Sequence, residues 1–276
     1  SSAALEAEIR ERIAAESALR TREKRIKKHQ SGLLRLATSK NLYEGNFTKA
    51  LSEITEIASH SLNVERASVW FYKNKKSSIY CADLYKKSSQ YHNQEMELGV
   101  VNYPNYFQAL ETERVIAANN AHTDPRTAEF SQSYLTPVSI NSMLDVPIQL
   151  KGETIGVLCL EHIGDFRDWA IDEQNFASYL AYMTSLAMES RDRKQAELIL
   201  QQQSAAMAAA SDGIGILDAE WKYIYLNDAY VRVYGYDRAE ELLGKSWRVL
   251  YPPQELERFD REIIPTFQQT NTFCLE

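Results

Sequence analysis

Two carboxylates, Asp145 and Glu161, stand within segments that are otherwise hydrophobic. An ionised carboxylate that leaves water must be paired or hydrogen-bonded, or it becomes neutral, because burying an unpaired charge is costly. Asp145 therefore contacts a ligand, or it takes the ordinary alternative of pointing to solvent or accepting a hydrogen bond from a loop amide. These two side chains are the sharpest candidates for binding chemistry in the chain.

The other reactive residue types form no recognisable catalytic set. Cys81, Cys159 and Cys274 are far apart and odd in number, which fits reduced thiols better than a disulfide framework or a zinc site. The sequence contains no Walker loop, nucleophile elbow or HExxH pair, and residues 172–207 contain no histidine that could accept a phosphoryl group. We therefore expect no enzyme and no metal site in this chain, with any catalytic output beyond residue 276.

Composition limits the partners and the compartment. The 276 residues carry a net charge of −7, which disfavours nucleic acid because duplex binding relies on Lys and Arg at the phosphates. Hydrophobic residues make up 44% of the chain, which is ordinary for a globular protein. No run approaches the roughly 20 apolar residues that a membrane helix needs. We expect a cytoplasmic chain without a membrane segment or nucleic-acid partner.

The elements that must position the two carboxylates follow from hydrophobic spacing and turn residues. Helix-like spacing covers about 33–62 and 103–110, and residues 119–140 are typical of a loop that wraps over a pocket. Strands are predicted at 67–72, 79–84, 114–118, 142–150 and 154–162. The last two strands flank the turn Lys151-Gly152-Glu153, where glycine can adopt a positive φ. An α+β fold with an antiparallel sheet flanked by helices is expected.

Two long helices enclose these elements. Residues 1–30 lack Gly and Pro and are rich in helix formers, and from Asp172 the chain is helical for about 40 residues. Both helices show apolar residues at alternating spacings of three and four, interrupted by polar ones, which predicts weak coiled coils in a parallel homodimer. A single amphipathic helix lying on its own domain is the alternative for the second helix. The dimer candidates are Leu5, Ile9, Leu19, Ile26, Tyr182, Leu186, Leu200 and Met207.

Short sequence motifs add a family resemblance to this element order. The order of elements resembles that of GAF domains, as do four segments, ASVW at 67–70, SMLDVPI at 142–148, GVLCLEH at 156–162 and RDWAIDEQNFA at 167–177. They are similar to GAF domains of bacterial, especially cyanobacterial, sensor histidine kinases. The resemblance covers about 31–189, and it implies a sensory domain.

A second resemblance begins near residue 206. The segments DGI at 212–214, YLN at 225–227, YGY at 234–236 and EELLGK at 240–245 resemble the opening of a PAS domain. Strands are expected at 214–217 and 223–226, with Asn227 capping the next helix and Asp237 with Glu240 starting the one after it. The family has roughly three more strands after its central helices, so we expect only the N-terminal part of the domain here. The expected organisation is a helix at 1–30, GAF at 31–189, a helical linker at 190–205 and PAS at 206–276.

The GAF resemblance raises known cofactors, each of which the residues disfavour. Covalent bilin needs a Cys in the wrapping segment, and residues 124–130 contain none. Cyclic nucleotide is disfavoured because Asp172, Glu173 and Phe176 lack the spacing of that signature. Haem would need an axial ligand, and only His122 and His162 fall near the expected pocket. No cofactor is evident, which leaves an unidentified small molecule.

What remains is an aromatic-rich pocket for such a molecule. The resemblance places it between the sheet and the wrapping loop, with the candidate lining residues Trp70, Tyr72, Tyr106, Phe107, Phe130, Tyr134, Met143, Asp145, Cys159 and Glu161. The combined prediction is a sensory and signal-transducing module of a larger protein, such as a sensor histidine kinase, that relays a signal through dimeric helices to an effector domain of the same polypeptide. The alternatives are a ligand-free GAF scaffold for dimerisation and the input module of a diguanylate cyclase.

Overall fold

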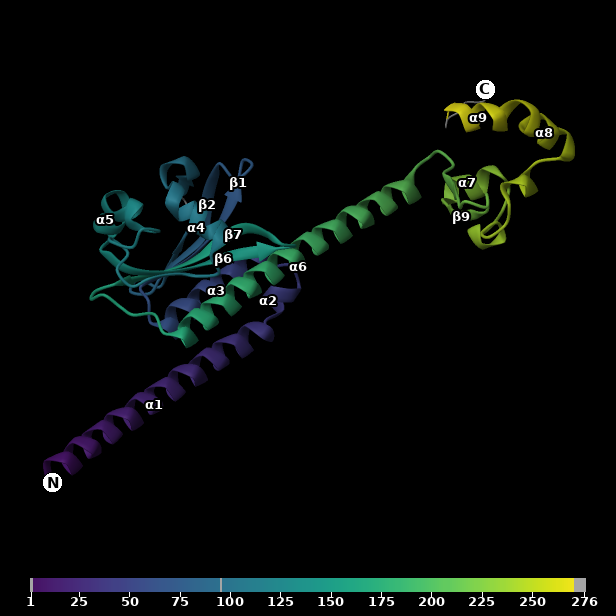
Figure 1. Cartoon of the computed structure of the whole chain (residues 1–276). Helices are drawn as coiled ribbons and strands as arrows, with labels where there is room; N and C mark the ends of the chain where they lie inside the picture. Colours follow the sequence, from purple (N-terminus) through teal and green to yellow (C-terminus); the bar gives the residue numbers. More distant parts are fainter. Residues whose placement is uncertain (1, 95, 271–276) are drawn as a thin grey trace. The chain divides into compact units, whose positions relative to one another are not determined.

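A computed structural model describes residues 2–94 and 96–270 (Figure 1). The chain divides into two compact units, residues 1–195 and 196–276. Within the described residues, no helix is long and apolar enough to cross a membrane.

The first unit begins with helices, continues through a sheet and ends in a long exit helix. The helices are α1 (Ser2–Ala37), α2 (Lys40–Tyr43), α3 (Phe47–Leu62), η1 (Val100–Asn102), α4 (Pro104–Thr112), η2 (Ala128–Phe130), η3 (Ser131–Leu135), α5 (Thr136–Val138) and α6 (Ile171–Ala209), the last of which continues into the second unit. The strands are β1 (Arg66–Lys73), β2 (Ser78–Lys86), β3 (Tyr91–Asn93), β4 (Glu97–Gly99), β5 (Ile116–Ala118), β6 (Ile140–Leu150) and β7 (Glu153–Ile163).

The sheet is antiparallel, with the order β3-β2-β1-β7-β6-β5 and β4 as a second partner of β2. Both predicted hairpins, β1–β2 and β6–β7, are confirmed. The sequence did not predict β3 and β4, which lie in a polar stretch. Their three-residue lengths are set by pairing with β2 and leave no periodic hydrophobic signal.

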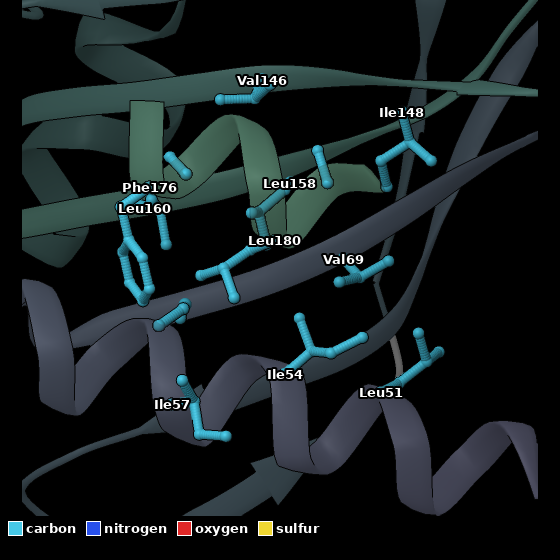
Figure 2. Close-up of a cluster of buried hydrophobic side chains, with 14 of the residues drawn as sticks. Leu51, Ile54, Ile57, Val69, Val146, Ile148, Leu158, Leu160, Phe176 and Leu180 are labelled. Atoms are coloured by element: carbon cyan, nitrogen blue, oxygen red, sulfur yellow. The ribbon is translucent and has the colours of Figure 1, made fainter. Parts of the chain in front are cut away.

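Two hydrophobic layers cover the two faces of this sheet. Figure 2 shows the first layer, in which Leu51 and Ile54 of α3 and Phe176 of α6 pack on alternate residues of the central strands, such as Val69 and Leu158. The second layer lies on the opposite face, where α4 and the wrapping segment 119–140 pack against the intervening strand residues. Because side chains alternate along a strand, each strand contributes to both layers.

Helix α1 is one continuous helix that runs past Gly32 and docks on the unit only near its C-terminal end. Its residues 3–24 are exposed. The Arg25 guanidinium binds the Asp172 carboxylate, with Nε 2.5 Å from Oδ2, and the His29 ring stacks on Phe176 at a centroid distance of 4.3 Å. Gly32 permits close contact, since a Cβ there would lie 2.9 Å from Ile57 Cγ2. The start of α6 is thereby tied to α1.

The second unit is a small α+β assembly around a two-stranded sheet. Its elements are β8 (Gly215–Leu217), β9 (Tyr223–Leu226), α7 (Asp228–Val233), η4 (Ala239–Glu241), η5 (Trp247–Leu250), α8 (Pro253–Arg258), η6 (Phe259–Ile263) and α9 (Ile264–Thr270). The predicted cap is confirmed, because the buried Asn227 Oδ1 accepts hydrogen bonds from Tyr230 N at 2.9 Å and Ile214 N at 2.8 Å.

The predicted start of η4, the helix after α7, was wrong by one residue. The carboxylate that accepts backbone hydrogen bonds is that of Glu241, from Asp237 N at 3.1 Å and Arg238 N at 3.0 Å, whereas Glu240 faces the Arg238 side chain. The helix begins at Ala239, which places Glu241 at its third position. The capping residue therefore lies one position later than the sequence pattern suggested.

Candidate functional site

The candidate pocket residues come together on one face of the first sheet. Residues separated by two along a strand share a face of the sheet. The candidate residues on the strands form three such pairs, namely Trp70 with Tyr72, Met143 with Asp145, and Cys159 with Glu161. Helix α4 places Tyr106 and Phe107 over this face, and the wrapping segment adds Phe130 and Tyr134.

The space they enclose is very small. Seven of the ten line a cavity of about 20 Å3, together with Ile79 and Leu98: Trp70, Tyr106, Phe130, Tyr134, Met143, Cys159 and Glu161. Tyr72, Phe107 and Asp145 do not line it, although they pack behind the residues that do. A cavity of this size holds about one water molecule. The side chains of the domain therefore fill their own pocket.

Aromatic packing closes the cavity. The Phe130 ring stacks on Tyr103 at 4.1 Å and meets the edge of Tyr106 at 4.8 Å, and Tyr106 meets Phe107 at 5.2 Å. Edge-to-face pairs at these distances stabilise a core beyond the burial of their area. A larger ligand would have to displace Phe130 and the wrapping segment that carries it.

Asp145 is fully buried and bonded within the protein, so the ordinary alternative of a solvent-facing carboxylate was wrong. The Tyr106 hydroxyl donates a hydrogen bond to Asp145 Oδ2 at 2.5 Å and lies 3.8 Å from Cys159 Sγ. Burial raises the pKa of Asp145 to about 7, against the opposing effect of the Tyr106 hydrogen bond. Burial also raises the pKa of Cys159 well above its usual value, so this thiol stays protonated.

Glu161 belongs to a buried three-residue network. Arg66 Nε lies 2.6 Å from Glu161 Oε2, the Tyr134 hydroxyl donates to Glu161 Oε1 at 2.7 Å, and Arg66 Nη2 donates to the Tyr134 oxygen at 3.1 Å. Burial lowers the pKa of Arg66, but Glu161 and Tyr134 together outweigh it and hold the pKa above its usual value. Sequence reasoning missed Arg66, which lies one residue before the first predicted strand, although β1 begins with it and pairs it with Glu161.

The wrapping segment is held by its own polar contacts. Arg126 Nη2 lies 2.7 Å from Asp124 Oδ2, its Nη1 lies 2.7 Å from Glu113 Oε2, and its Nη2 also donates to the Ala117 carbonyl. Both ring nitrogens of His122 are engaged, with Nδ1 at 2.7 Å from Ser131 Oγ and Nε2 at 2.9 Å from the Ile140 carbonyl. These residues fasten the loop over the cavity and leave His122 no nitrogen free for a haem iron. Among the described residues, no cluster of three His, Cys, Asp or Glu side chains could hold a metal ion.

The second unit holds a larger cavity, of about 270 Å3, that the sequence did not reveal. Its lining is apolar and aromatic and comes from Gly215, Leu217, Trp221, Tyr223, Tyr230, Trp247, Tyr251, Phe259, Ile263, Ile264 and Phe267. The high Tyr content of the chain was the available signal, but these residues lie on separate elements without a common spacing. A cavity of this volume approaches the lower end of the range for small-molecule sites.

The candidate dimer residues are mostly exposed. Leu5, Ile9, Leu19, Tyr182 and Leu200 are exposed, whereas Ile26, Leu186 and Met207 are half-buried. Tyr182 and Leu186 lie on the face of α6 opposite to Ala177 and Leu180, which pack on the sheet. The outer face of α6 thus remains unpartnered where its inner face is docked.

The first unit is thus an α+β domain, with α3 and α6 on one face of an antiparallel sheet and α4 with the wrapping segment on the other. The model of the GAF domain family matches residues 46–188, and the model of the PAS fold follows at residues 207–271. The chain belongs to the GAF domain family, with a PAS domain after it, as the sequence resemblance predicted. GAF and PAS domains are sensory parts of signalling proteins such as phytochromes.

Solved structures with the same fold include phytochromes. A Stigmatella aurantiaca phytochrome photosensory core module has a TM-score of 0.52 at 9% identity over 68% of this chain and 40% of its own. A bacteriophytochrome from R. palustris gives 0.52 at 10% identity over 66% and 41%. The phycoerythrobilin-bound GAF domain of a cyanobacterial phytochrome gives 0.51 at 14% identity over 60% and 97%. At such identities the likeness shows the fold alone. A comparison with curated protein sequences finds no match.

Proposed function

We propose that this chain is a homodimeric transmitter of a larger signalling protein, in which the outer face of α6 forms a parallel seam that passes a conformational signal from the GAF domain to the PAS domain. The observation that carries the proposal is the arrangement of two faces on α6. Between residues 173 and 187, Ala177, Leu180 and Thr184 are buried, and Tyr179 and Tyr182, on the opposite side of the helix, are each 58% exposed.

The exposed face continues as a regular seam beyond the domain. Starting at Tyr179, steps of three and four residues lead through Leu186 and Arg193 to Leu200 and Met207. Because an α-helix turns by about 100° per residue, a seven-residue repeat drifts by only about 20° per heptad, and the slow supercoil of a helix pair removes this drift. A parallel helix pair with this spacing buries these positions against the same residues of a second copy.

The polar centre of the seam supports a role in signalling. Glu189 and Arg193 interrupt the apolar positions, so the pair packs less firmly there than a Leu-rich zipper does. A loosely packed seam can take two registers of similar free energy, and a signal need only favour one of them. We further propose that the receiver is an effector domain of the same polypeptide, such as that of a sensor histidine kinase, with a diguanylate cyclase as the alternative.

Oxidative cross-linking tests the seam. Single cysteines replace Leu186, Arg193 and Leu200 in a Cys274→Ser background, in which the remaining Cys81 and Cys159 are buried. We expect each variant to form a covalent dimer, and we expect Gln195→Cys, which lies on the opposite face of α6, to stay monomeric on a denaturing gel. Light scattering should show a dimer at micromolar concentration. A monomer in solution, or equal cross-linking of Gln195→Cys, would overturn the proposal.

The closed cavity favours a second candidate function, a scaffold whose GAF domain dimerises without a ligand. The observation is the volume of about 20 Å3, which leaves no room for more than a water molecule. Native mass spectrometry with an absorption spectrum separates the two candidates. A bound small molecule or a visible absorption band favours the sensor. A dimer without a bound molecule favours the scaffold, provided that the activity of the effector domain in the parent protein is the same in every cross-linked variant.

A further inference from the structure

A groove of about 320 Å3 lies between α1 and α3, outside both cavities described above. It is lined by Lys28, Ser31, Gly32 and Arg35 of α1 and by Ile57, His60 and Ser61 of α3. Positions separated by three, four and seven residues share one face of a helix, so each helix presents a single stripe to the groove. Gly32 forms the floor, since a Cβ there would lie 3.2 Å from Ser61 Oγ.

The charge of this groove is positive. Lys28 and Arg35 line it, and no acidic side chain does. In the part of the chain that the structure describes, neither cation has an ion-pair partner, whereas Arg25 on the same helix pairs with Asp172. The two cations are seven residues apart, which is about 10 Å along the helix axis. Both can therefore reach a single anion bound between them.

Hydrogen-bonding groups at the bottom of the groove complete the site. Ser61 is only 9% exposed, and its hydroxyl has no hydrogen bond to any described residue. Because Ser61 lines the groove, this hydroxyl is available to a ligand there. His60 Nε2 lies 3.1 Å from the Tyr85 hydroxyl, which leaves Nδ1 for a ligand, and Ser31 adds a second hydroxyl.

We propose that this groove binds a phosphate-bearing small molecule. Phosphate oxygens accept several hydrogen bonds at once, and they suit a guanidinium and an ammonium group flanking hydroxyl donors. The bound anion would bridge α1 and α3 and hold the C-terminal part of α1 against the GAF domain. Binding at this site does not depend on the proposed transmission along α6, so either proposal can fail without the other.

Calorimetric titration of the full chain with inorganic pyrophosphate, at constant ionic strength, tests the site. We expect saturable binding with one site per chain, weakened at least tenfold in the Lys28→Gln/Arg35→Gln double variant. Lys27→Gln/Arg22→Gln is the matched control, because it removes the same charge from the same helix away from the groove, and its affinity should stay within twofold of wild type. Ser61→Ala should weaken binding severalfold, since one donor is lost.

Hydrogen exchange gives an independent readout. Pyrophosphate should slow exchange of the amides of residues 28–36 in the wild type and leave them unchanged in the double variant, while α6 amides beyond residue 196 stay the same in both. Circular dichroism must show equal helix content in all variants.

Three results would overturn the proposal. They are the absence of saturable pyrophosphate binding, equal loss of affinity in the control variant, and association of this stripe with anionic lipid vesicles without any response to pyrophosphate.

Discussion

The interiors of the GAF and PAS domains are both aromatic, but the GAF interior is closed and the PAS interior is open. The GAF cavity measures about 20 Å3 and the PAS cavity about 270 Å3. In the GAF domain, tyrosine hydroxyls donate to buried carboxylates, as Tyr106 does to Asp145. In the PAS domain, tyrosine hydroxyls bond to one another, with Tyr223 and Tyr230 at 2.7 Å.

The difference shows how each interior is held. Hydrogen bonds to buried carboxyl groups in the GAF domain fix the tyrosine rings, because a buried polar group without its partner is costly. The neutral tyrosine pairs of the PAS domain constrain the positions of their rings less, and the residues around them leave space for a ligand. We therefore expect substitutions inside the GAF domain to be costly and equivalent ones around the PAS cavity to be mild.

The largest effect is expected at Gly156 in β7. A Cβ at this position would lie 2.1 Å from the Trp70 carbonyl oxygen and 2.9 Å from Phe71 Cδ1, so β1 and β7 would have to separate. Gly156→Ala should destabilise the GAF domain by about 4 kcal/mol or more in urea unfolding. Gly152→Ala is the control in the same hairpin, where nothing lies within 4 Å and only the φ of +84° opposes alanine. A loss of about 1 kcal/mol is expected there, and equal losses would show that the GAF interior can adjust.

The second largest loss of stability is expected at Glu161 in β7. Glu161→Ala leaves the Arg66 guanidinium buried without its carboxylate, which costs about 3 to 5 kcal/mol. Asp260→Ala in the PAS domain breaks an exposed pair with Arg248 and should cost less than about 1 kcal/mol. Urea unfolding of both variants checks this, and a small effect of Glu161→Ala would mean that water reaches the network.

A matched pair of tryptophans compares the two interiors directly. Trp70 is 2% exposed at the GAF cavity, and Trp221 is 38% exposed at the PAS cavity. Trp70→Ala should lower the free energy of opening of β7 amides by about 3 kcal/mol, and Trp221→Ala should lower that of β9 amides by about 1 kcal/mol. Hydrogen exchange measures each domain separately. Similar losses at the two sites would remove the contrast between a closed and an open interior.

Over a single pH unit, the smallest effect is a pH dependence that comes from Asp145. Its pKa is raised to about 7 in the folded protein, so between pH 4 and 7 the folded protein holds a proton that the unfolded chain releases. Stability from this group is fully present below about pH 4 and is lost as the pH rises through about 7, at roughly 1 kcal/mol per pH unit. Asp145→Asn should remove that part of the slope in urea unfolding at several pH values. Asp260→Asn, an exposed carboxyl, should leave the slope between pH 5 and 7 unchanged, and an identical slope in Asp145→Asn would refute the assignment.

The sequence predicted the residues of the GAF interior better than their role. The GAF resemblance placed Trp70, Met143 and Glu161 around one pocket, and the structure groups them on one sheet face. It could not predict that these side chains would fill the space themselves, because cavity volume depends on how Phe130 packs on Tyr106 across a long separation in sequence. Arg66 was missed for a related reason, since a strand pattern does not show which residue will face Glu161.

The sequence by itself determined the order of the main elements and the family, and it predicts a heptad seam on α6, because hydrophobic periodicity, turn residues and short motifs act over short distances along the chain. Only the tertiary structure decided that Asp145 is buried and hydrogen-bonded to Tyr106, that the GAF cavity is closed, and that Lys28 and Arg35 face Ser61 across a groove. These properties arise from contacts between elements that are distant in the chain, where the fit of a few side chains sets volume, charge and hydrogen bonding.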